Sequence, residues 1–180
     1  MESTDLFLVG AEVGVAFAGF AGIIATFQFK EAKRIRRGDV VGLTMILQLS
    51  LNCALLSALP LLLSSFQINS AAIWTFCSLY GGSYVVYTML TTYRNMRGAT
   101  KRWAARLLFG SLYAVSGLGV LVQFLNASNL IFHREPGPYI AGIILGLGVV
   151  GFMFGRLLLR PLWIAVKEQE AVALSQNTTA

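Results

Sequence analysis

The sequence predicts an all-α fold, an integral membrane bundle of five transmembrane helices with its N-terminus outside and its C-terminus inside. Of the 180 residues, 56% are hydrophobic and only 12% are charged. Such a chain is too apolar for a soluble domain and too short for more than one membrane unit. Five long apolar segments follow one another, and all but one of the 14 Lys and Arg residues lie in three clusters beside them.

The first apolar segment, residues 6–29, has a single charge, Glu12. A helix of this length crosses a hydrocarbon layer about 30 Å thick. Small residues share one side of this helix, which predicts a ridge where a neighbouring backbone approaches closely. A second arc is small or polar, so we expect protein on two sides of the helix and a central place for it in the bundle. The ridge consists of Gly10, Gly14, Ala18, Ala21, Gly22 and Ala25, and the second arc of Glu12, Ala16, Gly19 and Thr26.

Residues 40–68 and 71–92 form the second and third predicted spans, joined by a short turn that makes them antiparallel neighbours. Pro60 lacks an amide hydrogen and crowds the carbonyl of Leu56, which predicts a bend in the second helix. Polar residues recur along one side of each helix and should face protein, because tyrosine hydroxyls in hydrocarbon need partners. They include Thr44, Gln48 and Asn52 in the second helix and Tyr80, Tyr84, Tyr87, Thr88 and Thr91 in the third.

The fourth and fifth predicted spans are residues 107–125 and 139–159. Between them, residues 126–138 form an outer loop whose Asn126-Ala-Ser128 matches a glycosylation sequon, although we do not expect modification in a protein this small. The transmembrane domain covers residues 1–166, and residues 167–180 form a polar tail, a frayed helix that ends in disorder. Glycines in the fifth helix, including two GxxxG matches, predict a second packing face: Gly142, Gly146, Gly151 and Gly155.

The basic clusters at residues 30–37, 94–106 and 156–167 fall on one side of a five-span topology. This is the positive-inside pattern and sets the orientation. Clusters next to a membrane also attract anionic lipids on the cytoplasmic side, whereas their position between apolar spans argues against nucleic acid as a partner. The residues expected to contact anionic lipid are Lys30, Lys33, Arg34, Arg36, Arg37, Arg94, Arg97, Lys101, Arg102 and Arg106.

Glu12 is the only acid inside a span, and an ionisable residue there is a candidate functional site. From the helix rise, Glu12 should lie about 9 Å below the outer edge of the hydrocarbon. The same calculation places other polar side chains at similar depths, which predicts a polar layer in the outer half of the bundle. The layer would contain Glu12, Gln48, Asn52, Tyr80, Tyr84 and Gln123. Two readings stay open: a carboxyl that gates or relays a cation or proton, and a hydrogen-bonded structural residue.

Several chemistries are not expected. The single histidine, His133, falls in the outer loop, so the chain provides no pair of intramembrane haem ligands and no His/Cys metal cluster. No lysine or second acid occurs inside a span. Cys53 and Cys77 should serve as small packing residues. We therefore predict no cofactor, no metal and no enzymatic activity; the best case for an enzyme would be a lipid-modifying one that uses Glu12.

The run AFAGFAGII at residues 16–24, the basic loop after it and the Leu-Pro-Leu of the second span resemble the opening of small, uncharacterised bacterial polytopic inner-membrane proteins. The resemblance covers about the first third of the chain. It implies a helical bundle in a bacterial inner (plasma) membrane, and it implies no activity, cofactor or catalytic residue.

Two functions are compatible with these patterns. The first is a non-enzymatic membrane subunit that packs through its Gly-rich helices against copies of itself or within a larger membrane complex. The second is a small ion or proton channel or transporter with a polar layer around Glu12. Flux through liposomes with and without Glu12 distinguishes them.

Overall fold

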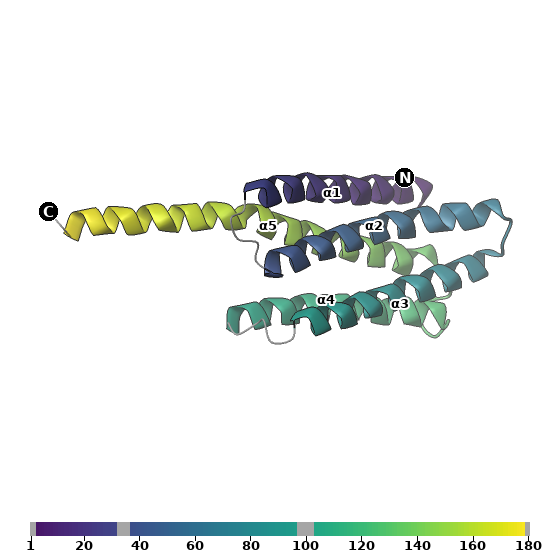
Figure 1. Cartoon of the computed structure of the whole chain (residues 1–180). Coiled ribbons are helices and arrows are strands. Elements are labelled where there is room, and N and C mark those ends of the chain that lie inside the picture. Colours follow the sequence, from purple (N-terminus) through teal and green to yellow (C-terminus); the bar gives the residue numbers. More distant parts are fainter. Residues whose placement is uncertain (1–2, 32–36, 97–102, 179–180) are drawn as a thin grey trace.

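The computed structural model describes residues 3–31, 37–96 and 103–178, which form five α-helices (Figure 1). They are α1 (Ser3–Glu31), α2 (Arg37–Ser65), α3 (Ser70–Met96), α4 (Trp103–Ala127) and α5 (Pro136–Thr178). No strand occurs in these three ranges, so the all-α prediction is confirmed. Four of the helices, all except α3, are long and apolar enough to cross a membrane, which indicates an integral membrane protein.

The helices lie side by side and alternate in direction (Figure 1). The N-terminus, the α2–α3 turn and the α4–α5 connection lie at one end of the bundle, called here the N-terminal end. The last residues of α1 and α3 and the first residues of α2 and α4 lie at the opposite end. Helices α1, α2 and α5 form one group, and α3 and α4 form a second group beside it.

Helix α1 lies at the edge of the bundle, so the prediction that it is central is wrong. Among the described residues its backbone lies close to α2 and α5 but not to α3 or α4, and it reaches α3 through Phe7, whose ring stacks on Trp74. Its small residues Gly10, Gly14, Ala18 and Ala21 are buried against these two neighbours. A helix can satisfy a single ridge of small residues with one close neighbour. The central positions belong instead to α2, which touches three helices, and α5, which touches four.

Local signals set the ends of the helices at the N-terminal end of the bundle. Asn69 caps α3, since its side-chain oxygen accepts a hydrogen bond from the amide of Ala71 at 3.0 Å. Helix α4 ends in a Schellman motif, with Asn129 in the left-handed conformation at φ 58° and the amide of Leu130 bonded to the carbonyl of Leu125 at 3.4 Å. These caps keep the α2–α3 and α4–α5 connections short.

The buried core is divided into two clusters along the bundle. The cluster at the N-terminal end joins α1, α2, α3 and α5 through Phe7, Leu56, Ile73, Cys77, Tyr139 and Ile143. The other joins α1, α2 and α5 through Ala21, Ile46, Val150 and Leu157. Both cysteines are buried in the packed interior, and neither forms a disulfide. Because only the first cluster includes α3, and neither includes α4, the two groups of helices are held together chiefly at the N-terminal end.

Helix α3 is less apolar than its neighbours because it contains many hydroxyl side chains, but several of these are paired within the bundle. Thr75 and Thr91 donate to carbonyls four residues earlier in the same helix, at 2.7 and 3.0 Å. Thr88 donates to the carbonyl of Val85 at 2.8 Å. A hydropathy scale counts each hydroxyl as a polar group that needs water, so it gives α3 a low value. In the structure these hydroxyls bond to carbonyls of their own helix instead.

Helix α5 continues well past the predicted end of the last span. It is helical from Pro136 to Thr178, about 65 Å at the usual helix rise, through Pro161 and the polar residues after it. Its C-terminal half projects beyond the other helices (Figure 1). The helix therefore extends well into the segment expected to be a frayed tail.

Candidate functional site

Glu12 does not join a polar layer inside the bundle. Its side chain is exposed on α1, on the side opposite the residues that pack against α2. The side-chain nitrogen and oxygen of Asn52 and the side-chain oxygen of Gln123 have no hydrogen-bond partner within the described chain. Glu12 therefore makes no hydrogen bond to any of these three atoms. The structure thus separates the carboxyl from the polar residues predicted to surround it.

Four of the other predicted residues lie where α2 meets α3. Asn52 is 4% exposed, Tyr80 and Tyr84 are half-buried, and the Gln48 side chain is exposed. The Tyr84 hydroxyl donates to the backbone carbonyl of Gln48 at 3.3 Å, and the rings of Tyr80 and Tyr84 lie 6.4 Å apart. The Tyr84 hydrogen bond joins α3 to α2, whereas the contact between the two tyrosine rings lies within α3. The buried Asn52 amide has no partner among the described residues.

Gln123 lies apart from that group, where α4 meets α5. It is 6% exposed, and its side-chain nitrogen donates to the carbonyls of Pro138 and Tyr139, each at 3.4 Å. Gly142 makes room for it, since a Cβ at this position would collide with the Gln123 nitrogen. The side-chain oxygen Oε1 is buried and has no partner among the described residues. One polar atom is therefore left unsatisfied inside the bundle.

The predicted packing residues divide into those in close contacts and those facing open space. A Cβ on Gly14 would lie 2.8 Å from the carbonyl oxygen of Ser50, a backbone atom that cannot rotate away. A Cβ at Gly10 or Gly146 would also meet a neighbour within 3 Å, and Gly151 has an ordinary contact with Phe17. A Cβ built on Gly22 or Gly155 would meet no atom of a neighbouring helix within 4 Å in the described chain, so neither glycine is required for a close approach. Ala18 is buried.

Of the residues expected to contact anionic lipid, only Arg94, near the end of α3, has a described side chain, and it is exposed. Lys30, Arg37 and Arg106 lie in helices, but their side chains are outside the described part. The remaining residues of this set, Lys33, Arg34, Arg36, Arg97, Lys101 and Arg102, lie outside the described residues or side chains.

Asn126 is a structural residue that the sequence analysis did not identify. It is fully buried, and its side-chain nitrogen donates to the Ser78 hydroxyl at 2.9 Å and to the Glu135 carbonyl at 3.1 Å. Its side-chain oxygen accepts from the amide of Glu135 at 3.2 Å. The side chain that begins the sequon therefore links α4 to α3 and to the start of α5.

A second missed contact involves the proline of α2. Pro60 has no amide hydrogen to offer the carbonyl of Leu56, the group that a residue at this position normally satisfies. The Tyr139 hydroxyl of α5 donates to that carbonyl at 2.7 Å, and the tyrosine is fully buried. An unpaired carbonyl is costly away from water, so Tyr139 replaces the missing helix bond. A search for tyrosines predicted at the depth of a span proline could have found it.

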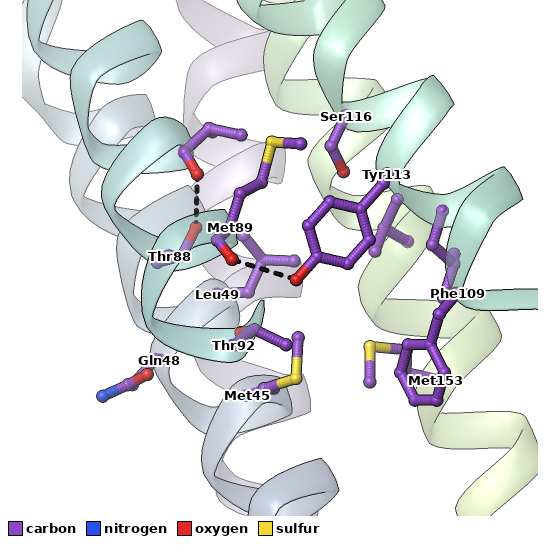
Figure 2. Close-up of a pocket in the computed structure, with 13 residues that line it drawn as sticks. Met45, Gln48, Leu49, Thr88, Met89, Thr92, Phe109, Tyr113, Ser116 and Met153 are labelled. Carbon is purple, nitrogen blue, oxygen red and sulfur yellow. Dashed lines mark hydrogen bonds between the residues drawn. The ribbon is translucent and has the colours of Figure 1, made fainter. Parts of the chain in front are cut away.

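A pocket lies between α2, α3, α4 and α5 (Figure 2). Met45, Met89 and Met153 contribute to its wall together with Phe109 and Tyr113. Figure 2 shows the Tyr113 hydroxyl directed at the carbonyl of Met89, a hydrogen bond of 2.9 Å. A second pocket, which shares part of its wall with the first, is lined in part by Gln123. Pockets lined mainly by apolar side chains with few polar groups suit apolar ligands.

Within the described residues, no three His, Cys, Asp or Glu side chains come together as a metal site would require. Two features remain as candidate functional sites: the exposed carboxyl of Glu12 on α1 and the pocket lined in part by Gln123. Comparison of the chain with protein-family models, curated proteins and solved structures gave no match.

Proposed function

We propose that this chain is a non-enzymatic membrane subunit that assembles with a second copy of itself through the outer face of α1. This face consists of Glu12, Ala16, Gly19 and Thr26, all of them exposed. The observation that carries the proposal is the position of Glu12, a carboxyl on the outside of an apolar helix. The predicted second protein contact of α1 is then supplied by another molecule.

The cost of a carboxyl in lipid supports this assignment. Glu12 lies eight residues after Thr4, the first residue of the apolar span, or about 12 Å along the helix. A glutamate side chain is too short to reach water from that depth by extending along the helix. Acidic residues in membrane spans almost always face protein or a water-filled cavity. Contact with protein removes Glu12 from the hydrocarbon.

A second copy supplies a suitable partner for Glu12. Within the four apolar spans of the described chain the only basic residue is Arg156, which lies near the C-terminal end of the α5 span, Pro136–Leu159. A protonated carboxyl both donates and accepts, so two Glu12 side chains related by a two-fold axis can bond to each other. Ala16 and Gly19 allow the two α1 backbones to approach.

The proposal includes five spans, N-out and C-in, in a bacterial inner membrane. Helix α3 has 27 residues and lies alongside the apolar helices, and its hydroxyls are bonded internally, which supports its crossing as the fifth span. The three basic clusters then follow helix ends at the end of the bundle opposite the N-terminus. Positive charge retained on the cytoplasmic side gives this orientation and the contact with anionic lipids.

The channel alternative requires more than one chain. Glu12 faces away from the other four helices, so a path lined by this carboxyl would have to run between copies. Proton flux into liposomes tests it: flux that is present with the wild-type chain and lost in Glu12→Gln would establish a relay. The subunit proposal expects no difference between the two.

The direct test is the mass of the assembly in lipid nanodiscs. We expect a dimer for the wild-type chain and for Glu12→Gln, which keeps donor and acceptor atoms. Glu12→Leu should raise the dissociation constant about 3- to 30-fold, the effect of one interhelical polar contact in a membrane. Gly19→Leu should weaken the dimer by steric blocking. Leu118→Phe, on an exposed position of α4, is the matched control. A wild-type monomer would overturn the proposal.

A further inference from the structure

The chain joins the α3–α4 pair to the other three helices at one end of the bundle. The chain passes between the two helix groups at two points, the α2–α3 turn and the α4–α5 connection. Both points lie at the N-terminal end (Figure 1). The remaining connections, from α1 to α2 and from α3 to α4, each stay within one group. The pair is therefore a helical hairpin with both of its links to the other group at the N-terminal end.

Hydrogen bonds and buried side chains reinforce this attachment. Gln123 donates to two backbone carbonyls at the start of α5, and Asn126 bonds to both backbone groups of Glu135. Among the described side chains of α4, Gln123 and Asn126 are the two that are buried. Helix α3 contributes Ile73 and Cys77 to the core cluster at the same end. Both helices of the pair are thus fixed to the other group near the N-terminal end.

The opposite end of the bundle is held differently. The core cluster there joins α1, α2 and α5, and no described residue of α3 or α4 belongs to it. Partway along α3, the Tyr84 hydroxyl donates to the carbonyl of Gln48 at 3.3 Å, which is long for such a bond. Beyond this bond a pocket lies between the pair and helices α2 and α5, and Tyr113 donates to Met89 within the pair (Figure 2).

Loosely packed helices separate easily in a membrane. Lipid chains are as apolar as the helix faces that they would cover, so helix association depends on close packing and interhelical hydrogen bonds. Three methionines line the pocket, and their flexible side chains rearrange at little cost. Regions with few buried contacts open at a lower free energy than the core does. The opposite end of the pair is therefore where the two helix groups come apart first.

We propose that the α3–α4 pair swings as one unit about its attachment at the N-terminal end, so that the two helix groups separate and close again where α2 and α4 begin. Within the pair, Tyr113 bonds to Met89 and Asn126 bonds to Ser78, each at 2.9 Å, which keeps α3 and α4 together. In the other group, Gly14 lets α1 pack directly on α2. The outer face of α1 takes no part, so the movement does not depend on dimerisation.

Distances between two spin labels on the full chain in nanodiscs test the movement. The background is Cys53→Ala with Cys77→Ala, and unlabelled chain is added in excess to remove distances between copies. Each label is attached to a cysteine at an exposed position. The opposite-end labels are at Val40→Cys and Leu107→Cys, the N-terminal-end labels at Leu62→Cys and Leu121→Cys, and the internal labels, both on the α3–α4 pair, at Leu79→Cys and Leu107→Cys.

We expect two separations for the opposite-end labels, the longer one from molecules in which the pair has swung away. The N-terminal-end labels and the internal labels should each give one narrow separation. Asn126→Ala weakens the attachment and should broaden the distribution for the N-terminal-end labels. Ser128→Ala, which removes a bond to the carbonyl of Leu125 in its own helix, should leave that distribution unchanged.

Three results contradict the proposal. One narrow separation for the opposite-end labels would rule out the movement. Equal broadening of the N-terminal-end labels in the unmodified background would mean that the attachment is not the pivot. Two separations for the internal labels would show that α3 and α4 do not move as one unit.

Discussion

The contact between α1 and α2 and the space between α2, α5 and the α3–α4 pair differ in how the helices meet. At the first, glycine places the α1 backbone directly against the α2 backbone, with Gly14 beside the carbonyl of Ser50. At the second, larger side chains hold the helices apart and leave open volume. Gly119 lies in the wall of that space, and a Cβ built on it would have only the Leu145 side chain nearby, at 3.8 Å. The same residue type thus closes one interface and lines the other.

Alanine at Gly14 should produce the largest loss of stability. Its Cβ would lie 2.8 to 3.1 Å from Ser50 and Ala54, including backbone atoms, and overpacking of this kind costs about 1–3 kcal/mol. Gly119→Ala is the matched control and should change the free energy of unfolding by less, in the stabilising direction, because alanine favours a helix. Unfolding in mixed micelles at increasing SDS measures both. Equal costs would mean that the two interfaces do not differ.

Asn126→Ala should have the next largest effect. It removes three hydrogen bonds and leaves the Glu135 amide without its partner. We expect a loss of about 1–2 kcal/mol in the same unfolding measurement. Ser128→Ala removes the sequon equally but only one exposed bond to the Leu125 carbonyl, so it should be nearly neutral. A similar loss in both variants would assign the effect to the sequon instead of the buried side chain.

The smallest effect expected is that of Tyr139→Phe, about 1 kcal/mol, because it leaves the packing in place and removes only the hydroxyl that donates to the Leu56 carbonyl. Combining Tyr139→Phe with Pro60→Ala tests whether Tyr139 compensates for the proline. Pro60→Ala restores the amide that can bond to the Leu56 carbonyl, so Tyr139→Phe should cost less in that background than in the wild type. Additive losses in the double-mutant cycle would show that Tyr139 does not compensate for the proline.

Packing faces were predictable from the sequence where one helix alone decides them. The ridge on α1 follows from helical periodicity, and Gly10, Gly14 and Ala18 do pack. Which neighbour the ridge meets is not contained in that periodicity. The same limit applies to Glu12, since depth along a helix gives the level of a residue in the bundle but not the direction in which its side chain points. Equal depth therefore predicted one polar layer, whereas the structure keeps Glu12 and Gln123 apart from the four members that lie where α2 meets α3.

The hydrogen bonds of Asn126 and Tyr139 could not be predicted from local patterns. Asn126 belongs to a sequon and a helix end, and both features suggest an exposed residue. Its burial depends on Ser78, which lies 48 positions earlier. Tyr139 and Leu56 are 83 positions apart. Such pairs form only when separate helices come together, and no periodicity within one helix records them.

By itself, the sequence determined that the described chain is helical, that four of its helices are apolar enough to cross a membrane, and where glycines form ridges. These properties depend on length, composition and periodicity, which each segment carries alone. Tertiary structure decided that α1 lies at the edge, that Glu12 faces outward and that a cavity separates the two helix groups. Those outcomes depend on rotation about each helix axis and on which surfaces fit, and neighbouring helices set both together.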